Sequence, residues 1–414
     1  MNRIIYLSLC IFAISGRLWG DDWREWRGPN RNGQATGVQS PDEWPKMLTP
    51  EWRVGTGLGH SSPVISGERL FQQSRFGDSD VVQCLDLRTG NTLWRSDVPG
   101  SVEKNLVAEF HNDGPNSTPA ATEEQLVTVG SSGVISCWDQ RTGELDWRQD
   151  FSKRFSKTSP LYGIGASPLI RDGICFVYAG SDDEGALLAI RMTDGVELWS
   201  WSGEGPGYSS PITIQAENSL AIAVLSRRHV LAVRCKDGML IWKHPIETQW
   251  DQNTVTPMLC DEKLIVAGYN HPTIAIATPG PIVEQRPKVV WSNNEHPLYM
   301  SSPVSFEQRM FGFTHRQKGA FICLDLEAGT TAWLSHGRLG NNASLTMIGS
   351  NILGITDDGT LRVIDATASE FRCIAEYSLP DPPIWAHPAF AGDLMIIKGR
   401  ESITAFRLSS TRGQ

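Results

Sequence analysis

The stretch LDLRTGNTLWR, residues 85–95, has the pattern of a strand, a tight turn and a second strand that carries a tryptophan. Close variants occur as WDQRTGELDWR at 138–148, IRMTDGVELWS at 190–200, VRCKDGMLIWK at 233–243 and LDLEAGTTAWL at 324–334. The glycine of this turn supplies the positive φ that a tight hairpin needs, and it does so without a steric cost. A hairpin that recurs in this way indicates a repeated structural unit.

A second mark, a small residue followed by proline and an apolar run, opens most of the repeats. These prolines are Pro63, Pro119, Pro168, Pro211, Pro257, Pro303 and Pro388, and NNASLTMIG at 341–349 fills the long gap before the last one. Short strands repeated every 40 to 55 residues, roughly, are typical of β-propeller blades. The tryptophans of the outer strands are expected to pack between neighbouring blades, and they are Trp52, Trp94, Trp147, Trp199, Trp242, Trp291 and Trp333.

The two ends of the repeat array complement each other. ESITAFRL at 401–408 has no tryptophan strand after it, and TPEWRVG at 49–55 has no blade of its own. Joining them completes the last blade and leaves no open sheet edge. The sequence therefore predicts an all-β, closed eight-bladed β-propeller over residues 45–408, with an N-terminal strand in the last blade. Residues 21–44 are expected to lie over the ring as a leader, and 409–414 form a C-terminal tail.

The N-terminus has the features of a signal peptide. Arg3 precedes an apolar run from Ile4 to Ile14, which is long enough for a signal peptide and too short to span a bilayer. Residues 1–20 are therefore predicted to direct export, to the periplasm or outside the cell, and no later segment is predicted to span a membrane. With 37 Lys and Arg against 46 Asp and Glu, the net charge is −9, which disfavours a nucleic acid as partner. A monomer is expected.

The repeats closely resemble the quinoprotein-dehydrogenase-like, or PQQ-like, repeat, in which an aspartate, a Thr-Gly turn and a tryptophan recur at fixed spacing. CLDLRTGNTLW, CWDQRTGELDW and CLDLEAGTTAW match that pattern at Asp86, Gly90, Trp94, Asp139, Gly143, Trp147, Asp325, Gly329 and Trp333. The resemblance covers most of the chain after residue 20, and WRGPNRNG at 26–33 is similar to the leader of secreted members. It implies the propeller fold and is less specific about function.

The family resemblance implies two functions. The family includes quinone-dependent alcohol and glucose dehydrogenases, and also a non-catalytic, protein-binding subunit of the outer-membrane β-barrel assembly machine. The dehydrogenases bind PQQ and calcium with an adjacent cysteine pair, a tryptophan platform and a Glu/Asn/Asp set beside a catalytic aspartate. This chain has no Cys-Cys pair and no residue-by-residue match to the calcium ligands. The favoured hypothesis is a non-catalytic propeller that binds a protein or a small polar ligand, and the alternative is a diverged PQQ-dependent oxidoreductase acting on an alcohol or a sugar.

Polar and aromatic residues are concentrated in loops that a propeller places on one face around its channel. The candidate ligand-binding residues are His60, His111, Asn116, Tyr162, Tyr208, Arg228, Asp251, Asn253, His271, Tyr299, His315, Arg316, Asn342, Trp385 and His387. Other polar residues of these loops are Arg75, Asp182, Asp183, Arg227, His229 and Lys318. Converging arginines and histidines suit an acidic group, and Asp251 and His387 have the chemistry of a base or a metal ligand. Alternatively, these side chains only cap loop backbones. No catalytic residue and no metal site are assigned.

Overall fold

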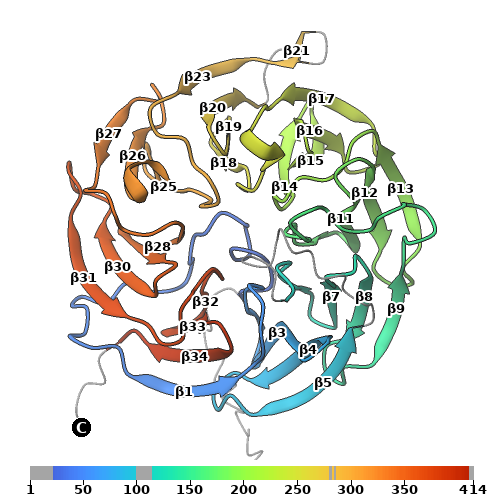
Figure 1. Ribbon diagram of the computed structural model, residues 1–414, viewed down its shortest axis with the longest axis horizontal. Coiled ribbons are helices and arrows are strands. Elements are labelled where there is room, and N and C mark those ends of the chain that lie inside the picture. Colours follow the sequence, from blue (N-terminus) through green and yellow to red (C-terminus); the bar gives the residue numbers. More distant parts are fainter. Residues whose placement is uncertain (1–21, 99–113, 279–281, 284–285, 410–414) are drawn as a thin grey trace, which may run out of the picture.

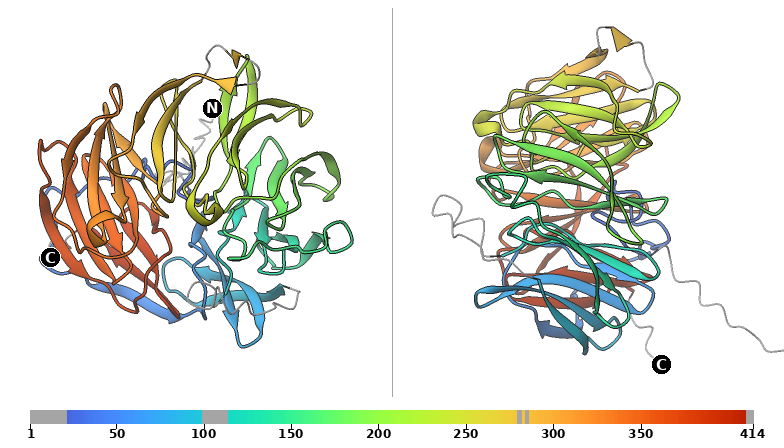
Figure 2. Two further views of the ribbon diagram at one scale, coloured as in Figure 1. Left: turned by 45° about the horizontal axis from the view of Figure 1, so that its top comes forward. Right: turned by 90° about the vertical axis from the view of Figure 1, so that its right-hand side faces the viewer.

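Eight four-stranded antiparallel sheets surround a central axis in the computed structural model of the chain (Figure 1). The structure describes residues 22–98, 114–278, 282–283 and 286–409. Each sheet is one blade, and in blades 1 to 7 the first strand lies nearest the axis and the last strand at the outer edge (Figure 1). Seen from the side, the blades stack around the axis into a ring that is thinner than it is wide (Figure 2). The predicted eight-bladed β-propeller is confirmed.

The first four blades follow one another along the chain without a crossover. Blade 1 contains β2 (Val64–Ser66), β3 (Arg69–Phe76), β4 (Ser79–Asp86) and β5 (Thr92–Val98). Blade 2 contains β6 (Ala120–Ala121), β7 (Gln125–Val129), β8 (Ile135–Asp139) and β9 (Leu145–Gln149). Blade 3 contains β10 (Leu169–Arg171), β11 (Ile174–Gly180), β12 (Gly185–Arg191) and β13 (Glu197–Ser202). Blade 4 contains β14 (Ile212–Ala216), β15 (Ser219–Leu225), β16 (His229–Arg234) and β17 (Leu240–Pro245).

The next three blades keep this order, apart from a small extra hairpin in the fifth. Blade 5 contains β18 (Met258–Cys260), β19 (Lys263–Gly268), β20 (His271–Ala277) and β23 (Val289–Asn293), and the hairpin consists of β21 (Ile282–Val283) and β22 (Arg286–Pro287). Blade 6 contains β24 (Val304–Phe306), β25 (Arg309–Thr314), β26 (Ala320–Asp325) and β27 (Thr331–Leu334). Blade 7 contains β28 (Ala343–Ile348), β29 (Asn351–Thr356), β30 (Thr360–Asp365) and β31 (Cys373–Ser378).

Blade 8 joins the two ends of the chain. It contains β32 (Ala389–Ala391), β33 (Leu394–Lys398), β34 (Ser402–Arg407) and, as its outermost strand, β1 (Pro50–Gly55). Strand β1 runs antiparallel to β34, with Trp52 opposite Ala405. The N-terminal strand therefore completes the last blade, as predicted, and closes the ring.

Helical structure in the described residues is limited to two short 3-10 turns. They are η1 (Gln249–Asp251), which precedes blade 5, and η2 (Arg316–Lys318), which lies between β25 and β26. None of the helices in these residues is long and apolar enough to cross a membrane.

The repeated turn depends on its aspartate and its glycine. In blade 2 the Asp139 carboxylate accepts hydrogen bonds of 2.8 Å from the backbone N–H groups of Arg141 and Thr142, and Gly143 has a φ of +74°. The indole of Trp94 in blade 1 lies against this glycine, so that a Cβ on Gly143 would come within 2.5 Å of the ring. Glycine is therefore needed both for the turn and for the neighbouring tryptophan.

Hydrogen bonds accompany these contacts between blades. The indole N–H of Trp94 donates to the carbonyl oxygen of Gln140 over 3.0 Å. Equivalent bonds of 2.6 to 3.1 Å join Trp52 to Leu87, Trp147 to Met192, Trp199 to Cys235 and Trp291 to Leu326. The indole nitrogen of Trp333 is buried without a hydrogen-bond partner among the described residues, and its ring packs edge-on against Phe371, 5.8 Å between ring centroids.

The residues that precede the repeated prolines form a series of hydrogen bonds around the channel, which we call the belt. The N–H of Ser62 donates to the Thr118 hydroxyl over 3.0 Å, and the N–H of Thr118 donates to the Ser167 hydroxyl over 2.9 Å. The relay continues through Ser167 to Ser210, Ser210 to Thr256, Thr256 to Ser302, and His387 to Ser62. The small polar residue thus links adjacent blades, while the following proline, which lacks an N–H, needs no donor partner.

In the view down the axis, the leader lies at the middle of the ring (blue in Figure 1). Its Trp23 carbonyl oxygen accepts a 2.8 Å hydrogen bond from the N–H of Ile65 in the innermost strand of blade 1. Further along, Gly33 and Ala35 flank a bridge to Met347 in blade 7, with hydrogen bonds of 2.8 and 2.9 Å. The expected position over the ring is therefore corrected, because the leader's backbone and apolar side chains find partners inside the channel.

After leaving the channel, the leader runs to the outer edge of the ring. The hydroxyl of Ser40 accepts a 2.7 Å hydrogen bond from the side chain of Asn351, and the carbonyl oxygen of Pro45 accepts one of 2.6 Å from the Tyr377 hydroxyl. Leader residues Trp23, Ala35 and Val38 share one apolar core with blades 1, 7 and 8. The leader is therefore part of the packed structure at the closure of the ring.

Candidate functional site

The channel contains two buried arginines of the leader. Arg31 donates to the carbonyl oxygens of Ser167 and Pro168 over 3.1 and 2.7 Å, and Arg27 donates to that of Pro303 over 2.5 Å. Each arginine is only 1 % exposed. The carbonyl groups of the belt thus bind side chains of the protein's own leader, which fills the channel at this level.

Glu25 is the carboxylate that accompanies these cations. Its side chain accepts from Arg31 over 3.3 Å and from Arg171 over 2.6 Å. Burial lowers the pKa of Arg31 to about 10 and that of Arg27 to about 9, with a further lowering of the Arg27 pKa by Arg31. Both guanidinium groups remain charged at neutral pH. The channel therefore has an internal ion network that belongs to the leader.

Trp26 and His387 are in contact with each other in the same channel, where the charge of Arg27 acts on His387. The indole N–H of Trp26 donates to the Thr256 hydroxyl over 3.0 Å, and its ring meets the His387 imidazole edge-on at 4.5 Å. His387 is 5 % exposed, and burial first, then the charge of Arg27, holds its pKa well below the usual range. His387 is therefore a neutral side chain packed under the leader and does not line an open funnel.

We call the side of the ring that carries the loops before each innermost strand, and the loops between second and third strands, the loop face. The opposite side is the turn face. On the loop face, Tyr269, Tyr299 and His315 of blades 5 and 6 form an aromatic cluster, with centroid distances of 4.3 Å between the tyrosines and 5.0 and 5.8 Å from them to His315. Burial raises the pKa of Tyr299 to about 12. Predicted residues Tyr299 and His315 are thus brought together.

An ion network on the same face joins blades 3, 4 and 5. Arg227 donates to Asp251 over 2.8 Å and to Asp183 over 2.7 Å. The hydroxyl of Tyr208 donates to Asp182 over 3.2 Å. Asp251, which was considered as a base or a metal ligand, therefore forms an ion pair with Arg227.

Two further predicted pairs are in contact. Tyr162 and Tyr208 meet edge-on with centroids 5.8 Å apart. His60 and Trp385 lie 5.9 Å apart where blade 8 meets blade 1. The aromatic residues of the loop face therefore occur both over blades 3 to 6 and at the closure of the ring.

Other predicted residues support loop backbones. Asn253 is fully buried and donates to the carbonyl oxygens of Ser226 and Arg227 over 2.9 and 2.8 Å. Asn342 accepts from the Ser301 hydroxyl over 2.7 Å. For these two residues the capping interpretation describes the contacts that the structure shows.

The remaining predicted residues have separate surroundings. His271 places its Nδ1 2.6 Å from the carbonyl oxygen of Pro272, and Asn116 is half-buried. Arg228 and Arg316 are exposed. His111 lies outside the described residues.

Two histidines of the loop face, His271 and His315, contribute little positive charge. Burial lowers the pKa of His271 and of His315, and the nearby Arg316 lowers the pKa of His315 further. Because both are then neutral at neutral pH, an acidic ligand would be attracted by the arginines and lysines of this face. Of the arginines and histidines that the sequence suggested for binding an acidic group, His271 and His315 therefore add little attraction at neutral pH.

Several residues of this region were absent from the predicted site. Trp26 was expected in a leader over the ring, and the sequence patterns did not indicate Trp250 or Tyr269 as site residues. Trp250, in ETQWDQN at 247–253, falls outside the position that tryptophan takes in the repeat. A tryptophan outside the repeat position was the feature of the sequence that could have indicated Trp250 as a site residue.

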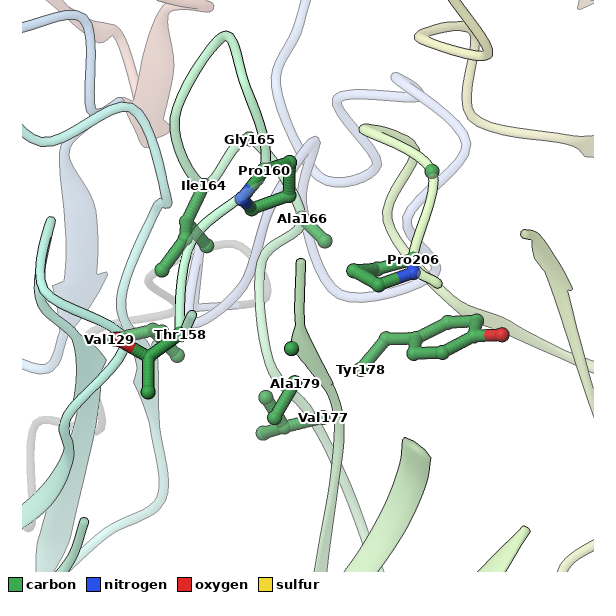
Figure 3. A pocket seen from close by; sticks show the side chains of 13 residues that line it. Val129, Thr158, Pro160, Ile164, Gly165, Ala166, Val177, Tyr178, Ala179 and Pro206 are labelled. Carbon is green, nitrogen blue, oxygen red and sulfur yellow. The ribbon is translucent and has the colours of Figure 1, made fainter. Parts of the chain in front are cut away.

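One small hollow lies between blades 2 and 3, near the loop face (Figure 3). Its lining includes Val129, Pro160, Ile164, Tyr178 and Pro206. A cavity volume of about 10 Å³ has room for a single water molecule. This hollow is too small for a cofactor.

The residues of the described part do not fit a quinone and a calcium ion. No group of three or more His, Cys, Asp or Glu side chains in these residues is arranged to hold a metal ion. The sequence has no adjacent cysteines, and Trp26 and Arg27 occupy the ring centre at the level of the belt. We therefore derive no chemical step that uses these cofactors.

Sequence comparison identifies two curated relatives. The chain is 27 % identical over 159 residues to the outer membrane protein assembly factor BamB of Burkholderia pseudomallei, covering 38 % of this chain and 36 % of that protein. It is 24 % identical over 227 residues to the beta-alanine-activating enzyme of Drosophila melanogaster, covering 53 % of this chain and 20 % of that protein. The aligned region thus spans about a third of the length of the BamB protein and about a fifth of the length of the beta-alanine-activating enzyme.

Solved structures show the same fold at low identity. BamB from Moraxella catarrhalis has a TM-score of 0.65 and 15 % identity, covering 87 % of this chain and all of that one. Quinohemoprotein alcohol dehydrogenase from Comamonas testosteroni has a TM-score of 0.69 and 14 % identity, covering 95 % of this chain and 81 % of that one. Likeness at this identity concerns the fold alone.

A family model gives the assignment that these partial matches leave open. The model described as outer membrane protein assembly factor BamB matches residues 77–335, which is more than half of the 414 residues. The matched range contains the repeated hairpins of blades 1, 2, 3, 4 and 6, with their Asp and Gly turn residues and tryptophans. The chain therefore belongs to the BamB family of PQQ-like propellers.

Proposed function

We propose that this protein is an exported, non-catalytic propeller that binds a protein partner through its loop face. The observation that carries the proposal is the filling of the channel by the leader, whose Arg27 and Arg31 bind the carbonyl groups of the belt. With the channel filled, a partner near the axis has to bind an outer face of the ring, and we take the loop face as that surface. Aromatic and charged side chains of that face suit a protein interface, where tyrosine, tryptophan and arginine are enriched.

The relatives support a protein-binding role. The family is described as an assembly factor of outer membrane proteins, which is a role that requires contact with other proteins. The quinohemoprotein dehydrogenase shares the fold at 14 % identity, and the described residues do not fit its class of cofactor. Both observations support our proposal that this chain is a binding member of the fold.

Export is the second part of the proposal. It is supported by the family name and by the N-terminal pattern, although residues 1–20 lie outside the described residues. Fusing residues 1–20 to an alkaline phosphatase that is active only outside the cytoplasm tests it. We expect enzyme activity with this fusion and none with Ile5→Asp, which interrupts the apolar run. Equal activity from both fusions, or none from the first, would show that the segment does not direct export.

Photo-crosslinking tests the binding surface. A benzophenone amino acid replaces Gln317 on the loop face or Glu144 on the turn face, both of which are exposed. After irradiation in the source cells, we expect a discrete protein adduct from position 317 and none from position 144. If neither position 317 nor position 400, a second site on the loop face, gives an adduct, the loop face is not the binding surface.

A further inference from the structure

Trp250 presents an exposed indole on the loop face between blades 4 and 5. Its side chain is 70 % exposed, and it lies in η1 with a φ of +61°, followed by Asp251 with a φ of +52°. Left-handed backbone costs an L-residue about 1 to 2 kcal/mol. Such strain persists where the surroundings enforce it, and it is concentrated at functional sites.

The surroundings of Trp250 do enforce this backbone. The N–H of Gln249 donates to the carbonyl oxygen of Tyr269 over 3.0 Å, and the carboxylate of Asp251 accepts from Arg227 over 2.8 Å. The side chain of Asn270 donates to Gln249 as well. Both neighbours of the tryptophan are thus fixed, so the backbone of Trp250 is held in place in advance of any contact. Binding at Trp250 then needs no further ordering of this loop.

A set of exposed cations lies on the same side of the loop face. They are Arg228 beside the Arg227 network, Arg316 and Lys318 in η2, and Arg338 in the loop before blade 7. The charged group of none of them has a hydrogen bond or an ion pair with another residue in the described ranges. Lys318 and Arg338 also line one shallow hollow with Gln317 and Gly337. We call Trp250 and these four cations the basic sector.

Backbone strain also occurs in the part of the basic sector that lies in η2 and in the loop before blade 7. Gln317, Lys318 and Arg338 have φ values of +56°, +62° and +69°. The N–H of Arg338 donates to the carbonyl oxygen of Gln317 over 3.0 Å, which ties the two loops together. The cations at this end therefore project from a fixed scaffold, as Trp250 does at the other.

Three acidic groups near the basic sector are already paired. Asp251 and Asp183 accept from Arg227, and Glu204 lies 2.7 Å from His229 and 3.8 Å from Lys243. Glu247, Glu295 and Asp357 of the same loops have no ion pair within the described part of the chain and compensate the four cations in part, in a chain whose net charge is −9. A local charge opposite in sign to that of the whole protein selects a partner of complementary charge.

We propose that the basic sector docks an acidic segment of the partner protein, whose carboxylates bind the four cations and whose apolar side chain covers Trp250. This inference rests on the proposed function and specifies the chemistry of its partner. Tryptophan and arginine are the residues that most often dominate the energy of such interfaces. Arginine also binds carboxylates in a two-pronged geometry.

The test uses the full-length protein and the adduct formed from position 317. We compare Trp250→Ala and a triple variant, Arg316→Glu with Lys318→Glu and Arg338→Glu, with a control pair of charge reversals on the turn face, Arg141→Glu with Lys236→Glu. We expect a loss of adduct of tenfold or more in the first two and an unchanged yield in the control. Mass spectrometry of the adduct should identify an acidic segment. Circular dichroism verifies that each variant is folded.

A second crosslinking position separates this inference from the proposed function. Arg400 lies on the loop face between β33 and β34 of blade 8, away from the basic sector. An adduct from position 400 together with none from 317, or an adduct from 317 that both variants leave unchanged, overturns the basic sector and leaves loop-face binding intact. No adduct from either position overturns the proposed function itself. An adduct made of two copies of this chain, or a basic partner segment, also overturns the inference.

Discussion

The glycine of the repeated turn illustrates how single residues determine this fold. Gly143 and Gly173 have nearly the same backbone, with φ values of +74° and +73°. A Cβ on Gly143 would meet the indole of Trp94 at 2.5 Å, whereas a Cβ on Gly173 would meet nothing within 4 Å. Comparing alanine at these two positions therefore separates the free-energy cost of a positive φ from that of the steric contact between blades.

We predict that Gly143→Ala lowers the free energy of unfolding by about 1 to 3 kcal/mol more than Gly173→Ala. The extra loss arises from overpacking against Trp94, since both variants place alanine at a similar positive φ. Urea denaturation followed by tryptophan fluorescence measures the difference. Equal losses in the two variants would mean that the tryptophan contact does not stabilise the ring.

The strained backbone at Trp250 leads to a second prediction at this scale. Trp250→Gly should raise the free energy of unfolding by roughly 0.5 to 1 kcal/mol, because glycine adopts a φ of +61° without the penalty that other residues incur. Trp250→Ala keeps the penalty and should give no such gain. If alanine stabilises the protein as much as glycine does, the gain comes from removing an exposed indole and not from relief of strain.

His387 is expected to make stability depend on pH. Its pKa in the folded protein is held well below 6.5 by burial and by Arg27, so the unfolded chain takes up the proton first as the pH falls. Stability is then present above pH 6.5 and is lost as the pH falls below it, by on the order of 1 kcal/mol for each pH unit until the folded pKa is reached. Thermal melts at pH 7.5 and 5.5 should show a smaller decrease in His387→Gln than in the unchanged protein. The same decrease in both would exclude His387 as a contributor.

At the scale of elements, the leader behaves as an internal part of the ring. Its Glu25 is buried between Arg31 and Arg171, so removing its charge leaves a buried cation without a counter-charge. We predict that Glu25→Gln costs about 3 to 5 kcal/mol of stability. Glu68→Gln, at an exposed ion pair with Arg88, should cost less than about 1 kcal/mol. Chemical denaturation of both variants tests this, and a similar small loss in both would show that the leader is not held by its charges.

The elements also show what the sequence could predict. The aspartate, glycine and tryptophan of each hairpin act within one turn and its neighbour, so their pattern was sufficient to predict the blades. The route of the leader could not be predicted, because Arg27 and Arg31 bind backbone carbonyl groups of Pro303 and Pro168, far away in the chain and without a side-chain signature. The same applies to Trp250, whose exposure depends on a left-handed backbone that no local motif encodes.

For the whole molecule, the N-terminal segment that begins at residue 22 both fills the channel and closes the ring. The leader occupies the channel, crosses blade 7 and then supplies β1 to blade 8. One segment therefore closes the ring and removes the space near the belt in which a cofactor would lie. Of the predicted site, the aromatic contacts of the loop face could be anticipated, whereas the burial of His387 beneath Trp26 could not.

A thermal-shift titration with pyrroloquinoline quinone, with and without calcium, tests most directly whether this ring is a binding scaffold and not a quinone enzyme. A protein that binds its ligand only when folded gains stability as the ligand concentration rises. With the channel filled by Trp26 and Arg27, we predict no change in melting temperature at any quinone concentration, in either buffer. A saturable, calcium-dependent rise in melting temperature would contradict this and indicate a cofactor site in the ring.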